Sequence, residues 1–193
     1  MLYINGEWKQ AQSGKTVPVK NPATGEVIQH VAYGGELETR QAIASAKEAF
    51  DGWKGKTGKE RGAFLERIAE NMRRERDNIA EAVTREMGKP LAEATGEVQL
   101  AIEYVEWYAE EAKRVYGDVI PASHENKRLM VFREPVGVVA AITPWNFPVA
   151  MITRKLAPAL AAGCSFVLKP ALETPVSAVK VIECFHEAGL PRG

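Results

Sequence analysis

Two apolar runs in the last third of the chain constrain the fold more than any other feature. Val136–Ile142 is continuously apolar, which is typical of a strand buried on both faces. After a polar break, the pattern predicts a helix over 149–162, a second buried strand over 164–168 and a second helix over 175–188. This order of strand, helix, strand and helix is the signature of a parallel α/β unit with right-handed connections.

A polar residue follows or ends each predicted strand. Asn146 comes just after the first strand, and Lys169 ends the second. Parallel strands end at one edge of their sheet, where ligands bind. The Asn146 amide can stabilise an oxygen that becomes negative during a reaction, or Asn146 is only a turn or cap residue ahead of Pro148. Lys169 can contact the ribose or phosphate of a nucleotide, or it is an ordinary surface lysine.

The first 116 residues are expected to form hairpins followed by helices. Asn5-Gly6 is a strong hairpin turn signal, so residues 1–34 are expected to form short strands and turns. Helices are predicted from Glu36 onward, one of them starting at the capping box Thr57–Glu60 and another ending at Gly88. The helix that begins at Glu36 carries an apolar stripe made of Ile43, Ala46, Phe50 and Trp53. The helix after Pro90 is expected to bury an apolar stripe made of Leu91, Ala94, Val98, Ile102 and Val105.

Residues 117–135 are predicted to form an element separate from the segments before and after it. Two short apolar runs, 119–121 and 129–132, flank the polar turn 124–127 and predict a β-hairpin. A hairpin between a helical region and the next strand either projects as a subunit contact or packs on its own domain.

Composition excludes several classes of protein. The 193 residues carry 25 Lys and Arg against 25 Asp and Glu, so neither nucleic acid nor an acidic membrane surface is expected as a partner. Cys164 and Cys184 form no disulfide framework, and no metal-ligand spacing occurs. Each thiol is expected to be an inert buried side chain. With no long apolar run and no signal-like start, we expect a cytoplasmic protein without a membrane span.

Several motifs together resemble the NAD(P)-dependent aldehyde dehydrogenase superfamily. The strongest are Thr-Pro-Trp-Asn-Phe-Pro at 143–148, Lys-Pro-Ala at 169–171 and Thr-Pro at 174–175, supported by Glu-Met-Gly-Lys-Pro at 86–90. The resemblance implies an α/β fold, namely the N-terminal portion of a Rossmann-type parallel sheet with a helical N-terminal region and a protruding β-hairpin. It divides the chain into cofactor-domain strands and helices (1–116), a hairpin of the oligomerisation region (117–135) and the first βαβα of the cofactor-binding sheet (136–193).

The resemblance also assigns roles to residues. Asn146 is expected to hold the oxyanion, and Lys169 is expected to contact the adenosine ribose of NAD or NADP. Leu172 stands where many NAD-preferring members have a glutamate, so cofactor preference stays open. The residues expected to bind the cofactor are Ile142, Thr143, Pro144, Trp145, Lys169, Pro170, Ala171 and Leu172.

The substrate is indicated by the run Ile-Thr-Arg-Lys at 152–155. It resembles a run in succinate-semialdehyde dehydrogenases whose arginine contacts the substrate carboxylate, which places that role on Arg154. A guanidinium can bind a carboxylate at two points. On side-chain statistics alone, pairing of Arg154 with a local acid is an equally good interpretation.

By the same resemblance, the chain corresponds to about the first two-fifths of a longer enzyme. The nucleophilic cysteine and the general-base glutamate would then lie beyond it, and the chain alone would be inactive. The full-length enzyme is expected to be a homodimer or homotetramer that oxidises a small aldehyde, succinate semialdehyde above all. The alternatives are a broad-specificity aldehyde dehydrogenase and a non-catalytic cofactor-binding or assembly module.

Overall fold

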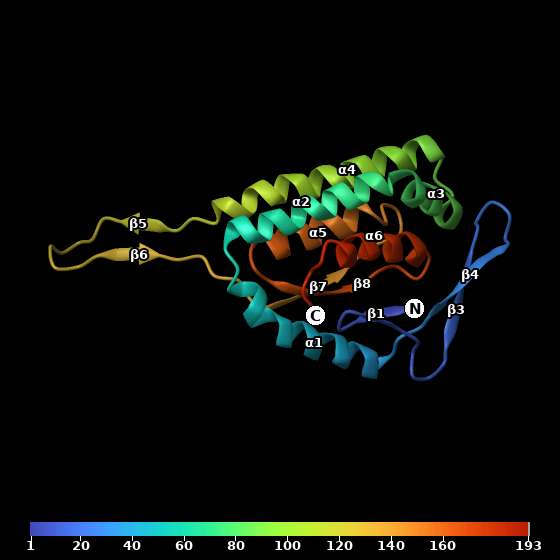
Figure 1. The fold of residues 1–193 in the computed structure, drawn as a ribbon, viewed down its shortest axis with the longest axis horizontal. Coiled ribbons are helices and arrows are strands. Elements are labelled where there is room, and N and C mark those ends of the chain that lie inside the picture. Colours follow the sequence, from blue (N-terminus) through green and yellow to red (C-terminus); the bar gives the residue numbers. More distant parts are fainter. Residues whose placement is uncertain (193) are drawn as a thin grey trace.

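The computed structural model describes residues 1–192, so Gly193, the last residue of the predicted third segment, lies outside the described residues. Helices surround a small parallel sheet, and two antiparallel ribbons extend from this body at opposite ends (Figure 1). The helices are α1 (Glu36–Lys54), α2 (Gly58–Arg74), α3 (Arg76–Met87), α4 (Leu91–Glu111), α5 (Ala150–Ala161) and α6 (Pro175–Glu187), with a short 3-10 turn, η1 (Ala112–Arg114), after α4.

The predicted parallel unit is confirmed. Strands β7 (Val138–Ile142) and β8 (Ser165–Lys169) pair in parallel, and α5 connects them before α6 follows β8. Ile142 pairs with Lys169 at the carboxyl ends of the strands, and the Thr143 N–H extends the ladder by donating to the Lys169 carbonyl at 3.2 Å. The two predicted polar strand ends therefore meet at one edge of the sheet.

Within residues 1–192 the prediction that these strands are buried on both faces is not met. In β7 only Ala141 is buried, while Ile142 is 69% exposed, and Val136 lies outside the strand and is 87% exposed. In β8 only Ser165 is buried. Among residues 1–192 each strand has one neighbour, so both keep a free edge, and the helices that contact them leave part of the sheet uncovered.

The N-terminal hairpins form as predicted. Strands β1 (Leu2–Ile4) and β2 (Glu7–Lys9) are antiparallel, and Asn5 and Gly6 between them have φ of 56° and 74°. Positive φ at both central residues defines a type I′ turn, whose twist matches that of the strands. Strands β3 (Thr16–Lys20) and β4 (Val27–Ala32) form a second antiparallel ribbon with a register shift at Val19/Lys20.

The helix ends also follow the predicted signals. Thr57 Oγ1 accepts from the Glu60 N–H at 3.2 Å, while Glu60 Oε2 accepts from the Thr57 N–H at 2.7 Å, and α2 begins at the next residue. Gly88 ends α3 with φ of 84°. One predicted burial is wrong: Leu91, the first residue of α4, is 55% exposed. Ile43, in the apolar stripe of α1, is 48% exposed and lines the groove described below.

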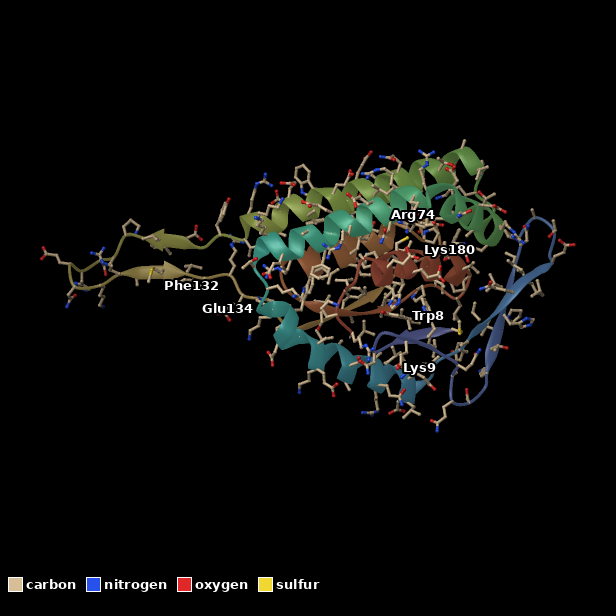
Figure 2. The ribbon with its side chains drawn as sticks, viewed as in Figure 1. Trp8, Lys9, Arg74, Phe132, Glu134 and Lys180 are labelled. Carbon is tan, nitrogen blue, oxygen red and sulfur yellow. The ribbon has the colours of Figure 1, made fainter. Side chains whose placement is uncertain are left out.

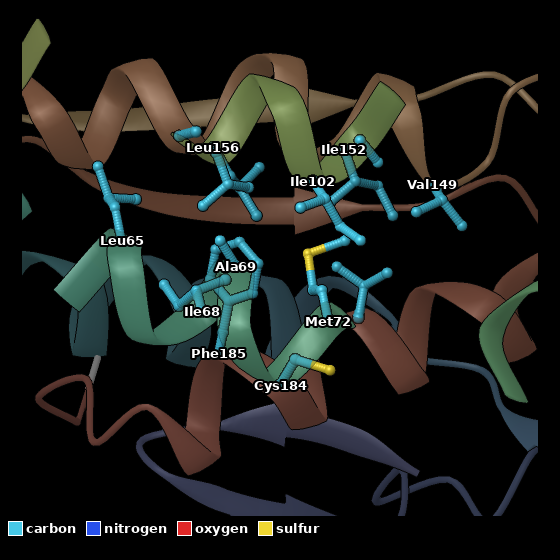
Figure 3. Close-up of a cluster of buried hydrophobic side chains, with 14 of the residues drawn as sticks. Leu65, Ile68, Ala69, Met72, Ile102, Val149, Ile152, Leu156, Cys184 and Phe185 are labelled. Carbon is cyan, nitrogen blue, oxygen red and sulfur yellow. The ribbon is translucent and has the colours of Figure 1, made fainter. Parts of the chain in front are cut away.

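The hydrophobic core lies between α2, α4, α5 and α6 (Figure 3). Its fully buried side chains come from these four helices, from α3 and from the turn before α5. The largest members include Leu65, Ile68, Met72, Ile102, Val149, Ile152 and Leu156.

The predicted hairpin projects from the body. Strands β5 (Asp118–Ile120) and β6 (Leu129–Val131) are antiparallel, every residue of both is exposed, and the ribbon points away from the helices (Figure 1). Phe132, labelled in Figure 2, is 75% exposed just after β6. Within residues 1–192 the hairpin therefore does not pack on the body of the chain.

We expect Gly62→Ala to destabilise the full-length protein by about 1–3 kcal/mol, although alanine favours helices. A Cβ at Gly62 would lie 2.7 Å from the carbonyl oxygen of Ala109, where α2 approaches α4. Gly96→Ala in α4 is the control, because a Cβ there has no heavy atom within 4 Å among the described residues. Chemical denaturation should show Gly96→Ala neutral or stabilising, and equal effects of the two variants would contradict close α2–α4 packing.

Candidate functional site

The predicted cofactor residues divide into two groups in the structure. Five of the eight line an open groove of about 540 Å³ beside β8, bounded by α1, α6 and β1: Ile142, Lys169, Pro170, Ala171 and Leu172. The other three, Thr143, Pro144 and Trp145, are absent from its lining within the described chain. They belong to the loop between β7 and α5. The walls of the groove are mostly apolar, and Lys169 brings a cation to it from the strand end.

Asn146 lies in the bend between β7 and α5, where its side chain is exposed. Its backbone carbonyl accepts a hydrogen bond from Lys89 Nζ at 3.1 Å. The same ammonium lies 4.0 Å from the ring centroid of Phe147, the next residue, which is a cation–π distance. Lys89 therefore holds the Asn146 carbonyl and the Phe147 ring, while the Asn146 side chain takes no part in these contacts.

A buried carboxylate completes this arrangement. Glu97 Oε2 lies 2.5 Å from Lys89 Nζ, and Glu97 Oε1 accepts from the N–H groups of Val149 at 2.8 Å and Ala150 at 3.2 Å. The Glu97 side chain is 0% exposed. A carboxylate on the first N–H groups of a helix satisfies donors that have no partner within the helix. Glu97, carried by α4, thus caps α5, which has no side-chain cap at its own Val149.

Arg154 lies on α5 just after this capped end, and its side chain is exposed. No carboxylate of residues 1–192 lies within 4.0 Å of its guanidinium. Within residues 1–192 no local acid therefore pairs with Arg154. Asn146 and Arg154 are placed on one continuous segment, the bend and the helix that it enters.

A second buried carboxylate holds the start of α6. Glu86 Oε2 accepts from the Val176 N–H at 2.7 Å, and Glu86 Oε1 accepts from the Ser177 N–H at 2.8 Å. Burial, which leaves Glu86 4% exposed, raises its pKa to about 7, opposed by these hydrogen bonds. The capped helix begins directly after the segment 169–172 that lines the groove.

The opposite ends of both helices are bound by donors. Arg61 Nε donates to the Ala161 carbonyl of α5 at 2.9 Å, and Arg67 Nε donates to the Ala188 carbonyl after α6 at 3.0 Å. Both arginines belong to α2. Each helix of the parallel unit therefore has an acid at its N-terminus and an arginine at its C-terminus, as the helix dipole favours.

The sequence argument missed Glu86, Lys89 and Glu97 as site residues. A signal was present, because Glu86 lies three residues after buried Val83, and Glu97 lies three after buried Ala94. Each glutamate thus occupies the apolar stripe of its helix. A charge on a buried face must find partners, but the sequence does not say which ones.

The two cysteines are buried as expected, and burial raises the pKa of Cys184 to about 12. Within residues 1–192 no group of three or more His, Cys, Asp or Glu side chains could hold a metal ion. In the same part of the chain no helix combines the length and apolar character needed to cross a membrane.

Comparison with known proteins identifies the family. Residues 8–193 match the aldehyde dehydrogenase family, to which this chain belongs. It is 56% identical over 191 residues to a glutarate-semialdehyde dehydrogenase of Pseudomonas putida, covering 99% of this chain and 40% of the relative. It is 51% identical over 190 residues to the NADP(+) succinate-semialdehyde dehydrogenase of Escherichia coli, covering 98% and 39%. The chain thus spans about two-fifths of the length of these relatives.

Solved structures agree with this assignment. A succinate-semialdehyde dehydrogenase from Burkholderia pseudomallei superposes with a TM-score of 0.97 at 51% identity, covering 98% of this chain and 39% of that one. A betaine aldehyde dehydrogenase from Staphylococcus aureus in complex with NAD+ has a TM-score of 0.96 at 34% identity, covering 98% and 39%. The described residues therefore form the N-terminal part of the aldehyde dehydrogenase fold, and the relatives support a nicotinamide cofactor.

We expect Glu97→Ala to destabilise the full-length protein by about 3–5 kcal/mol, because it leaves the Lys89 ammonium buried without its carboxylate. It also removes the cap of α5. Glu106→Ala is the control on the same helix, since its partner Arg73 is half exposed and the pair should contribute at most about 1 kcal/mol. Equal losses in urea denaturation would contradict the special role of Glu97.

The raised pKa of Glu86 predicts a pH dependence of stability. Its stabilising contribution is present below the unfolded pKa of 4.5 and is lost as the pH rises through about 7. The shift corresponds to on the order of 3 kcal/mol. Between pH 5 and pH 8 the full-length protein should lose more thermal stability than its Glu86→Gln variant, and parallel pH profiles would contradict the raised pKa.

Proposed function

We propose that the full-length protein oxidises a small aldehyde bearing a terminal carboxylate, of the succinate or glutarate semialdehyde class, to the diacid. The observation that carries this proposal is Arg154, an exposed guanidinium with no acidic partner among residues 1–192, on the helix entered from the Asn146 bend. A planar guanidinium suits a carboxylate held at two points. The names of two similar relatives, the glutarate-semialdehyde and succinate-semialdehyde dehydrogenases, support the same substrate class.

The groove beside β8 fits one end of a nicotinamide dinucleotide. Its apolar walls suit an adenine ring, and Lys169 can donate to a ribose hydroxyl or a phosphate. Leu172 places no carboxylate there to repel a 2′-phosphate, so we infer that this position does not discriminate against NADP. When bound, the nicotinamide supplies the oxidant for the aldehyde carbon.

Asn146 is proposed to hold the oxygen of the aldehyde as it becomes negative. Its backbone is fixed by Lys89, while its amide is exposed and free to donate. Donors that are fixed before the reaction stabilise developing charge without reorganisation. Neither cysteine here suits a nucleophile, because both are buried, so the attacking group is proposed to come from outside residues 1–192.

Three expectations stay predictions at this point. They are the homodimer or homotetramer, with the projecting β5–β6 hairpin as a contact, the cytoplasmic location, and the division at residues 116 and 135. A non-catalytic module and a broad-specificity enzyme are the competing functions that the next experiments separate from the proposal.

Arg154→Ala should lower kcat/KM for succinate and glutarate semialdehyde by about 10- to 150-fold, because a charge-assisted pair contributes roughly 1.5–3 kcal/mol. An uncharged aldehyde such as hexanal should be nearly unaffected. Arg154→Lys should recover only part of the loss, since an ammonium lacks the planar fork.

The neighbouring cation provides the control for Arg154. Lys155→Ala removes one positive charge from the same turn of α5 and should leave the ratio of kcat/KM values for the two kinds of aldehyde unchanged. If Arg154→Ala also leaves this ratio unchanged, substrate-carboxylate binding by Arg154 is wrong, and a broad-specificity enzyme is favoured.

Asn146→Ala should lower kcat by about 10²–10³, the usual cost of removing one oxyanion donor. The dissociation constant of the cofactor should change little, because the amide is proposed to contact the aldehyde oxygen. Steady-state kinetics and a binding titration measure the two quantities separately. Unchanged turnover would return Asn146 to the role of a turn residue.

A further inference from the structure

The start of α6 depends on a side chain from another helix. Thr174, the residue before α6, does not cap it: its Oγ1 is buried and has no hydrogen-bond partner within residues 1–192. Pro175, at the first helical position, has no N–H to satisfy. The next two N–H groups, of Val176 and Ser177, both donate to Glu86. Within the described chain Glu86 is thus the side-chain acceptor that closes this helix end.

The segment that lines the groove is held between two fixed points. At one end, Lys169 is paired with Ile142 in the sheet, and its carbonyl accepts from the Thr143 N–H at 3.2 Å. At the other end, Glu86 holds the first N–H groups of α6 at 2.7 and 2.8 Å. Between these points lie only residues 170–175. A short segment clamped at both ends has few conformations left, so its geometry follows from the positions of the clamps.

The clamp at α6 is built into a rigid part of the molecule. Glu86 belongs to α3, which packs directly against α6, and its side chain is almost completely buried. At the far end of α6, Asn71 Nδ2 donates to the Cys184 carbonyl at 3.0 Å and Arg67 Nε donates to the Ala188 carbonyl at 3.0 Å. These contacts act at the far end of α6, whereas among the described side chains Glu86 acts at the end that directly follows the segment 169–172.

We propose that Glu86 is a positioning residue for nicotinamide-cofactor binding, acting through the backbone of Val176 and Ser177 on the groove segment 169–172. It touches neither cofactor nor aldehyde. The proposal rests on the proposed function, because it needs the groove beside β8 to be the cofactor site. By this proposal α3 contributes to cofactor binding through Glu86, although Glu86 does not line the groove.

Glu86→Gln tests the proposal in the full-length protein. The amide keeps the shape of the side chain but has one acceptor oxygen, so one of the two backbone bonds is lost. Calorimetric titration with NAD+ and with NADP+ should show a dissociation constant raised about five- to tenfold for whichever cofactor binds. The value of kcat at saturating cofactor and the KM for the semialdehyde should stay within about twofold of the parent.

Hydrogen exchange supplies a readout that does not depend on turnover. The amides of Val176 and Ser177 should exchange faster in Glu86→Gln than in the parent, whereas core amides of α2 should not. Glu86→Asp keeps the carboxyl group on a shorter side chain and should give intermediate cofactor affinity. If Glu86→Gln does not fold, the dissociation constant of the cofactor measured for Glu86→Asp tests the proposal instead.

Arg67→Gln is the matched control, because it removes a side-chain bond from the distant end of the same helix. It should leave cofactor affinity within about twofold of the parent. An equal rise for Arg67→Gln and Glu86→Gln, or an unchanged dissociation constant in Glu86→Gln despite faster exchange at Val176 and Ser177, would overturn the positioning role. Failure of the parent to bind either dinucleotide would instead overturn the proposed function.

Discussion

The Glu97 carboxylate is the contact on which the candidate site depends most. It is fully buried, where an ionised group is tolerated only with partners that replace water. Its partners are the Lys89 ammonium at 2.5 Å and two N–H groups at the start of α5. Because none of these groups can be left alone in the interior, α4, the turn after α3 and the start of α5 must assemble together. The bend that carries Asn146 is part of this assembly, because it directly precedes α5 and its carbonyl accepts from Lys89.

The same physical principle explains the rest of the parallel unit. Apolar packing holds α5 and α6 against α2, α3 and α4 but is non-directional, so it does not by itself fix how far each helix has slid along its axis. Hydrogen bonds are directional and fix this axial position. They come from Glu97 and Glu86 at the N-termini of the two helices and from Arg61 and Arg67 at the C-termini. Thus α2, α3 and α4 position the strand-end loops through α5 and α6, while α1 packs against the sheet.

Local patterns in the sequence predicted much of this fold, because their causes are local. The Asn5-Gly6 turn, the Thr57 capping box and the Gly88 helix end depend on residues a few positions apart, and each is confirmed. Burial of strands 136–142 and of Leu91 was predicted wrongly, since burial depends on which elements cover a surface. The Lys89–Asn146 contact joins residues 57 positions apart, and no periodicity reports such a pair.

If Asn146 holds the oxyanion as proposed, the Lys89–Glu97 pair serves catalysis by holding the bend that carries Asn146. A double-mutant cycle on kcat, with Lys89→Met and Asn146→Ala in the full-length protein, tests it most directly. If Lys89 acts through Asn146, Lys89→Met lowers kcat in the parent but causes little further loss once the Asn146 amide is gone. Fully additive losses in ΔG‡, with the double variant slowed by the product of the two single effects, would contradict the claim.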